Sequence, residues 1–171
     1  AMYHYVRPLN KTRYPLIKGL HSDLFKDHIH FLAKNYKFIR IEDLQEHFIT
    51  KKELPKKSCL LTFDDGYKDH FDYVFPTLKA HQIQGCFYAP IKTITSNHVL
   101  DVNKIHFLLA TVQDIQLLIR DIFQSITQNQ NKFNLKAPNE YYQKLAHANR
   151  FDPAEIIFVK RVLQVELPTE F

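Results

Sequence analysis

A short apolar run that ends in two adjacent carboxylates constrains this chain more than any other feature. Residues 59–63 read Cys-Leu-Leu-Thr-Phe and are followed directly by Asp64, Asp65 and Gly66. A short continuous apolar run that stops at turn residues is typical of a buried strand. We therefore expect a core strand over residues 59–63, with the acidic pair at its carboxyl end.

The first ninety residues alternate between short strands and amphipathic helices. Further strands are predicted at residues 2–6, 38–39 and 84–89. Helices are predicted from Ser22, which with Asp23 offers a cap and an acidic first turn, and over residues 41–48 and 67–81, where Pro76 resets or kinks the helix. This alternation predicts βα units and a largely parallel sheet, open or closed into a barrel, with the chemistry at the carboxyl ends of the strands.

The pattern becomes helical after about residue 98. Helices are predicted over residues 102–110, 113–128, 139–148 and 153–167, and residues 125–136 are expected to form a polar, Asn- and Gln-rich connection. The apolar stripe between Ile115 and Phe123 is expected to face a core rather than a cofactor. We predict an α/β domain over residues 2–98 and a helical insertion or subdomain over residues 99–171.

Composition excludes several classes of protein. The chain has 171 residues of which 45% are hydrophobic, so it can build a core and is not disordered. No apolar run approaches the roughly 20 residues that span a bilayer. The net charge of +5 is scattered, and the two cysteines lack zinc-ligand spacing, so we expect no nucleic-acid partner and no disulfide framework. If Met2 is the true start there is no secretory signal, and we expect a cytoplasmic location.

The adjacent aspartates carry the chemistry of the sequence. Two buried carboxylates side by side repel each other unless a metal ion or a proton lies between them. Gly66 permits a backbone turn that a residue with a Cβ resists. A helix cap plus a turn aspartate remains the structural alternative. A phosphoaspartyl phosphatase needs its two acids one residue apart, and a calcium loop needs ligands at alternating positions, so both are disfavoured.

Residues 62–66, Thr-Phe-Asp-Asp-Gly, resemble the first motif of the polysaccharide deacetylases of the NodB-homology type, carbohydrate esterase family 4. Residues 2–6, 67–78 and 85–89 resemble the family's first strand, the helix after the motif and the next strand. Residues 151–153 and 160–164 resemble an insertion of a bacterial surface-glycan subgroup. The resemblance covers the N-terminal half of the catalytic domain.

The resemblance implies a deformed, here partial, βα barrel and a metal-dependent hydrolysis of N-acetyl groups on the amino sugars of a bacterial glycan. By similarity, Asp64 would be the catalytic base and Asp65 would bind a divalent metal, zinc in many relatives. His4, at the end of the first strand, and Tyr67, beside the motif, are our candidate substrate-binding residues.

The departures from the family pattern leave the activity open. The family completes its metal site with a His-x-x-x-His pair, but no two of the ten histidines are four positions apart. A catalytic zinc site needs about three protein ligands. His70 is expected at the surface, and the chain is expected to be a truncated enzyme that lacks the second metal-binding motif.

Two other interpretations therefore stand beside the deacetylase. The first is a non-catalytic remnant or assembly module, whose open sheet edge would be covered by self-association or by a partner. The second is glycan binding without turnover, on the aromatic residues Tyr5, Phe63 and Tyr67.

Overall fold

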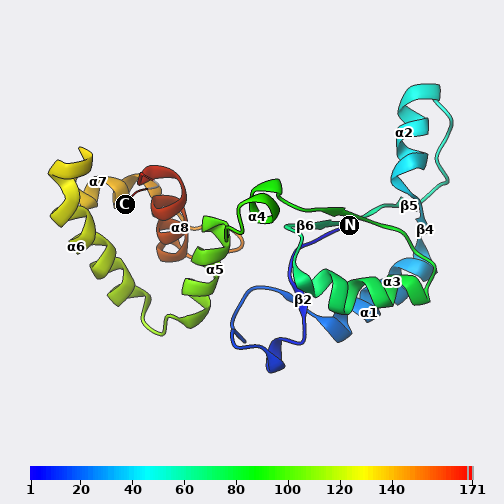
Figure 1. The fold of residues 1–171 in the computed structure, drawn as a ribbon, viewed down its shortest axis with the longest axis horizontal. Coiled ribbons are helices and arrows are strands. Elements are labelled where there is room, and N and C mark those ends of the chain that lie inside the picture. Colours follow the sequence, from blue (N-terminus) through cyan, green and yellow to red (C-terminus); the bar gives the residue numbers. More distant parts are fainter. Residues whose placement is uncertain (169, 171) are drawn as a thin grey trace. The chain divides into compact units, whose positions relative to one another are not determined.

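The computed structural model describes residues 1–168 and 170, so Thr169 and Phe171 at the end of the predicted helical region lie outside the described residues. The chain divides into two compact units, Ala1–His98 and Val99–Phe171 (Figure 1). Each unit has its own cluster of buried apolar side chains. No helix among the described residues has the length and apolar character needed to cross a membrane.

The strands of the first unit pair in parallel, as the alternating pattern predicted. A three-stranded sheet has the order β1 (Met2–Tyr3), β6 (Leu61–Asp64) and β7 (Gly85–Tyr88). Two further parallel pairs join β2 (Val6–Arg7) to β3 (Leu20–His21) and β4 (Lys37–Phe38) to β5 (Ser58–Cys59). The α/β class with parallel sheets is confirmed.

The register of the sheet stacks three aromatic rings and fixes which residues meet at its carboxyl end. Tyr3 lies opposite Phe63, and Phe63 lies opposite Phe87. The ring of Phe63 stacks on Tyr3 at 5.4 Å and on Phe87 at 4.9 Å between centroids. Since Tyr3 and Phe63 are level, the residues that follow them, His4 and Asp64, emerge at the same edge.

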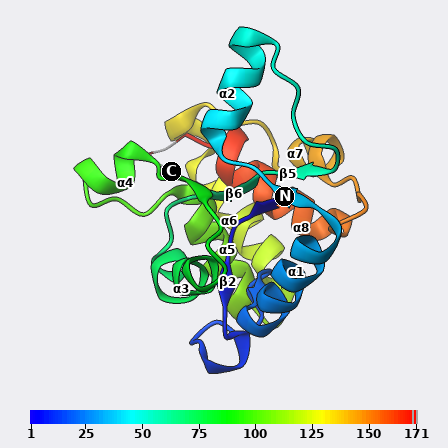
Figure 2. The same cartoon turned by 90° about the vertical axis from the view of Figure 1, so that its right-hand side faces the viewer.

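Helices α1 and α3 (Phe75–Ala80) cover one side of these strands, and α2 projects away from them (Figure 2). Helix α1 (Ser22–Asn35) buries Phe25 and Ile29, which are four residues apart and so share a face. Its cap is His21 rather than the predicted Ser22, because the His21 ring accepts the N–H of Asp23. Helix α2 spans Ile41–Thr50, the short α4 spans Ile91–Thr95, and η1 spans Leu9–Lys11.

The predicted helix over residues 67–81 starts later than expected and is irregular. A π-helical turn, η2 (His70–Val74), leads into α3 (Phe75–Ala80). Asp65 and Gly66 both have positive φ and belong to a turn, which delays the helix. Pro76 has no N–H to donate, so the chain enters α3 through the wider turn, where Phe75 N–H reaches the His70 carbonyl.

The second unit is helical, as its sequence pattern predicted. It contains α5 (Asp101–Thr111), α6 (Ile115–Phe133), α7 (Pro138–Leu145), α8 (Ala154–Arg161) and the π-helical turn η3 (Val162–Glu166). The predicted polar connection over residues 125–136 is wrong for most of its length, because α6 continues to Phe133. Ile126 is fully buried and extends the stripe of Ile119 and Ile122, while Gln124, Gln128 and Asn131 are exposed. The helix ends at Asn134, a left-handed cap.

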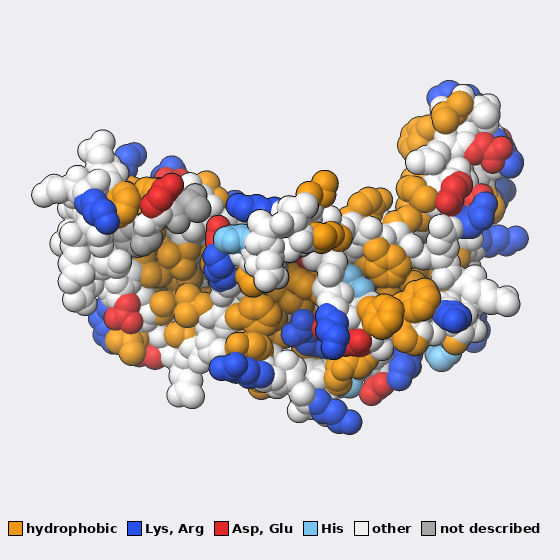
Figure 3. All heavy atoms as spheres, viewed as in Figure 1, with side chains coloured by type: hydrophobic (Ala, Val, Ile, Leu, Met, Phe, Trp, Pro, Cys, Tyr) orange, Lys and Arg blue, Asp and Glu red, His pale blue; other side chains and the backbone are white. Residues whose placement is uncertain are grey.

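Hydrophobic side chains also reach the surface of both units (Figure 3). In the first unit they include Phe48 and Ile49 on α2, Phe71 and Phe75 beside each other on η2 and α3, and Phe87 and Tyr88 on β7.

Candidate functional site

The carboxyl end of β6 carries the acidic pair on two different backbone conformations. Asp64 is the last residue of β6 and is paired with Tyr88 of β7. Asp65 and Gly66 follow with φ of 74° and 61°, both in the left-handed region. A Cβ on Gly66 would lie 2.8 Å from the Cβ of Ala89, so the turn has room only for glycine. This turn therefore sends the chain out of the strand immediately after Asp64.

Three of the four predicted site residues meet at one carboxylate oxygen. His4 Nδ1 lies 3.2 Å from Asp65 Oδ2, and the Tyr67 hydroxyl donates a hydrogen bond of 2.6 Å to the same oxygen. The sheet register contributes to the first contact, since β1 ends at Tyr3 opposite Phe63, and His4 therefore follows at the edge where Asp64 and Asp65 leave β6. The Asp65 side chain is three-quarters buried and that of His4 is half-exposed, so the cluster lies at the surface.

Asp64, the fourth predicted residue, stands apart from this cluster. Asp64 is partly buried. Within residues 1–168 and 170, no hydrogen bond or ion pair reaches its carboxylate. Of the two neighbouring acids, Asp65 is thus held by protein groups, whereas Asp64 keeps its oxygens available to a molecule from solvent.

Tyr67 is held in place by a second aromatic ring. Its ring stacks on that of Tyr5 with centroids 4.1 Å apart, and the Arg7 guanidinium lies over the Tyr5 ring at 4.9 Å. Burial, together with the hydrogen bond to Asp65, raises the pKa of Tyr67 above its ordinary value. The phenol therefore remains protonated at neutral pH and acts as a donor to Asp65.

Arg7, which lies over the Tyr5 ring, also forms an ion pair. Arg7 Nε donates to Asp69 Oδ2 at 2.6 Å, and both side chains are only 14% exposed. The pair links β2 to the segment after the acidic turn, so it ties together the two pieces of chain that carry His4 and Asp65.

The expectation that His70 lies at the surface is wrong. His70 is 4% exposed, and its Nε2 donates to the main-chain carbonyl of His4 at 2.8 Å. Because a carbonyl only accepts, this bond places the proton on Nε2 and leaves Nδ1 as a buried acceptor without a partner among the described residues. The signal was in the sequence: His70, Val74 and Leu78 are spaced by four, and all three are buried.

The interpretation of Tyr5 and Phe63 as a glycan-binding surface is also wrong. Phe63 is completely buried and Tyr5 is 4% exposed, so neither ring can receive a sugar. Only Tyr67 of the three is partly accessible, and its hydroxyl is engaged by Asp65.

The site fits a divalent metal only in part. A carboxylate and an imidazole, those of Asp65 and His4, are the donor types that zinc prefers. No group of three or more metal-binding side chains occurs among residues 1–168 and 170. The described chain thus offers two ligands where a catalytic site needs about three.

Comparison with known proteins places the chain in a family. The Polysaccharide deacetylase family matches residues 51–143, a segment that contains both aspartates and more than half of the chain. The chain belongs to the polysaccharide deacetylase family.

Individual relatives match only parts of their own length. The YxkH protein of Bacillus subtilis (strain 168) is 28% identical over 100 residues, which are 58% of this chain and 34% of YxkH. The poly-β-1,6-N-acetyl-D-glucosamine N-deacetylase of Escherichia coli (strain K12) is 34% identical over 65 residues, 37% of this chain and 10% of that enzyme.

Among solved structures, a de-N-acetylase from Aggregatibacter actinomycetemcomitans has a TM-score of 0.47 and 26% identity, over 57% of this chain and 38% of that one. IcaB from Ammonifex degensii has a TM-score of 0.47 and 15% identity, over 95% of this chain and 79% of that one. The chain therefore spans about a third or less of the length of the curated relatives that it matches.

Proposed function

We propose that this chain carries the acidic motif of an N-deacetylase that hydrolyses N-acetyl groups on the amino sugars of a glycan. The family membership and the substrate for which the Escherichia coli relative is named support this substrate class. The observation that carries the proposal is the division between the two acids: Asp65 is bound by His4 and Tyr67, while Asp64 is not engaged by any described side chain.

This division suits a general base next to a fixed anion. In the reaction, water adds to the acetyl carbonyl carbon and passes a proton to Asp64. The C–N bond then breaks, the proton goes to the leaving nitrogen, and the products are acetate and a free amine. Tyr67 and His4 hold the Asp65 carboxylate in one orientation during this reaction. Asp64 therefore acts as the base while Asp65 stays a fixed anion.

A divalent cation, zinc by similarity, would polarise the acetyl carbonyl in such a reaction. Asp65 and His4 are the side chains that could contribute to holding it. Because the described residues do not complete a site, we propose that any further ligands come from outside them, from another segment or another chain. We also propose that the parallel strands of the first unit form part of the deformed βα barrel that is typical of the family.

Zinc stoichiometry of the purified chain, measured by elemental analysis, tests this proposal directly. The matched control is Asp65→Asn, since asparagine tolerates the positive φ at this position and removes the charge. About one ion per chain, lost in the variant, supports a metal site on Asp65. Acetate release from N-acetylglucosamine oligomers in the presence of zinc should then disappear in Asp64→Asn, while the metal remains bound.

The opposite result favours the second candidate, a non-catalytic assembly module. No bound ion above the Asp65→Asn control, and no acetate release, would exclude a complete catalytic site on this chain. One observation supports the assembly module: β7 lies at the edge of its sheet, and its residues Phe87 and Tyr88 are 43% and 52% exposed. An exposed edge strand offers unpaired backbone groups to another strand.

A further inference from the structure

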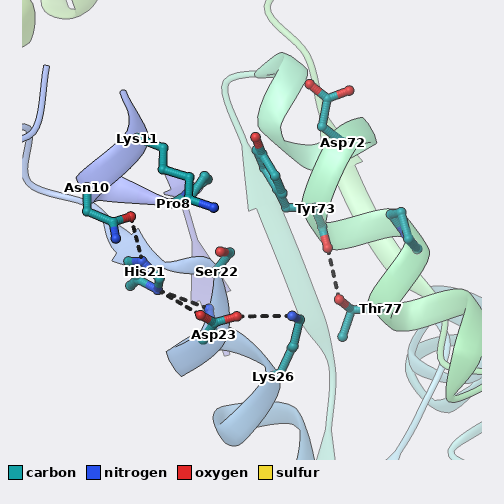
Figure 4. A pocket seen from close by; sticks show the side chains of 11 residues that line it. Pro8, Asn10, Lys11, His21, Ser22, Asp23, Lys26, Asp72, Tyr73 and Thr77 are labelled. Carbon is teal, nitrogen blue, oxygen red and sulfur yellow. Dashed lines mark hydrogen bonds and ion pairs between the residues drawn. The ribbon is translucent and has the colours of Figure 1, made fainter. Parts of the chain in front are cut away.

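The first unit contains a cavity that the acidic motif does not use. Its volume is about 540 Å³, and it lies between two walls (Figure 4). One wall is formed by the chain after β2 and by the start of α1, and the other by η2 and α3. None of His4, Asp64, Asp65 and Tyr67 lines it. Pro8, which lines the cavity, directly follows Arg7 of the ion pair with Asp69 in the chain.

A hydroxyl group that no described residue engages lines the first wall. Ser22 as a residue is 9% exposed, no described residue forms a hydrogen bond with its side chain, and the side chain lines the cavity. The hydroxyl of Ser22 can both donate to and accept from a molecule in the cavity.

The neighbouring polar groups are fixed in orientation by their own bonds. The His21 ring accepts the Asp23 N–H at Nδ1, 3.2 Å away, so its Nε2 carries the proton and faces Asn10 Oδ1 at 3.4 Å. This assignment leaves the amide N–H groups of Asn10, a residue of the cavity lining, available as donors. The wall therefore presents ordered donors and acceptors rather than mobile charges.

The second wall offers a flat apolar surface. Tyr73 is 37% exposed and lines the cavity together with Pro76, while Pro8 lies on the opposite wall. Rings of this kind pack against the C–H faces of a ligand, and an aromatic ring with a polar tip serves a molecule that is apolar on one side and wet on the other. Thr77 adds no free donor, because its hydroxyl donates to the Tyr73 carbonyl at 2.9 Å.

The charges around the cavity cancel. Lys26 is paired with Asp23 at 3.0 Å, and Asp72 is paired with Lys68, outside the cavity, at 3.5 Å. The lining thus holds two lysines, Lys11 and Lys26, against the two acids Asp23 and Asp72. An anion or a cation gains little net attraction from such a lining, whereas a neutral ligand rich in hydroxyl groups can form hydrogen bonds with Ser22 and Asn10.

We propose that this cavity binds one pyranose unit of a neutral glycan, with a sugar face on Tyr73 and its hydroxyl groups on Ser22 and Asn10. It would be a second glycan-binding site beside the acidic motif. The choice of a sugar over other neutral polyols rests on the function proposed above.

Two-dimensional NMR of the whole chain, titrated with a β-1,6-linked N-acetylglucosamine tetrasaccharide, tests the inference. We expect the amide signals of residues 9–11, 21–26, 72–75 and 77 to shift. Tyr73→Ala and Asn10→Ala should each weaken the binding at least five-fold, and Asn10 is exposed, so its variant should fold. Tyr36→Ala, which removes a tyrosine with a similar exposure of 41%, should leave the affinity unchanged.

Two comparisons separate this inference from the proposed function. Asp65→Asn should leave the sugar-induced shifts intact even though it removes the carboxylate that His4 and Tyr67 contact. Shifts confined to His4 and Tyr67, or shifts caused by inorganic sulfate but not by the sugar, would overturn the inference and leave the deacetylase proposal standing. Sugar binding in the cavity without any acetate release would support the inference and count against the deacetylase.

Discussion

The imidazole of His70 donates from Nε2 to the main-chain carbonyl of His4, 2.8 Å away, across 66 positions of sequence. The His70 side chain is buried, and the rings around it include those of Phe63, Tyr67 and Phe87. His4 in turn contacts Asp65 through its own side chain. The end of β1 is therefore fixed to the segment after the acidic turn from two directions.

Replacement of His70 by phenylalanine should destabilise the first unit. The variant keeps a ring of similar size but leaves the His4 carbonyl without its buried donor, at an expected cost of about 1–3 kcal/mol. Urea unfolding followed by circular dichroism measures this change. His30→Phe, at an exposed position of α1, should alter the unfolding free energy by less than about 0.5 kcal/mol. Equal effects of the two substitutions would contradict the role given to His70.

Gly66→Ala should be among the most damaging single substitutions near the site. The new Cβ would approach Ala89 to 2.8 Å at a φ of 61°, so strain and overlap add. We expect a loss of about 2 kcal/mol or more in a thermal or urea unfolding experiment. Lys68→Ala, two residues away with a side chain that is 87% exposed, should be nearly neutral.

The raised pKa of Tyr67 predicts how alkaline pH affects stability. Burial, followed by the hydrogen bond to Asp65, raises this pKa in the folded chain above the value of about 10 expected when it is unfolded. The contribution of the protonated phenol is therefore complete below about pH 10 and declines as the pH rises above it. The unfolding free energy of the wild-type chain should fall more steeply between about pH 9.5 and 11.5 than that of Tyr67→Phe. If the unfolding free energies of the two chains changed in parallel with pH, the pKa of Tyr67 would not be raised by folding.

The ion pair between Arg7 and Asp69 should contribute far more than the pair between Lys68 and Asp72. Asp69→Asn leaves the guanidinium, only 14% exposed, without its charged partner, at an expected cost of about 2 kcal/mol. Asp72→Asn breaks a pair whose lysine is 87% exposed, and it should cost less than about 0.5 kcal/mol. Chemical unfolding of both variants at low and high salt checks this order, and only the Lys68 pair should be sensitive to salt.

Self-association through β7 is the remaining prediction. Light scattering during size-exclusion chromatography should give a mass above the 20.3 kDa of one chain as the concentration rises. Tyr88→Lys puts a charge on the exposed edge strand and should restore the mass of one chain, whereas Tyr36→Lys, outside any strand, should not. A single-chain mass for the wild type throughout the micromolar range would refute the prediction.

The pattern of apolar residues was sufficient to predict the parallel strands and most of the helices, because burial in each follows a local period. It could not predict that residues 2–6 divide between β1 and β2, or that Leu60 separates β5 from β6. These interruptions arise because the two parts of each run pair with different strands. The length of α6 was missed because polar residues surround Ile126, the one buried position that continues its stripe.

The candidate site was predictable in its components but not in its contacts. The acidic pair and His4 follow strands, so their meeting at one edge follows from parallel pairing. That Asp65 rather than Asp64 receives His4 and Tyr67 depends on the left-handed turn, which sequence alone does not reveal. The burial of His70, by contrast, was open to prediction, since His70, Val74 and Leu78 are spaced by four and all three are buried.

The left-handed backbone at Asp65 limits which amino acids can replace this residue during evolution. The residue has to provide a charged oxygen for His4 and Tyr67 and also accept a φ of 74°. Asparagine and glycine accept the conformation but lose the charge, while glutamate keeps the charge but is poorly suited to the conformation. No single exchange satisfies both requirements, so drift at this position would have to sacrifice either the fold of the turn or its chemistry.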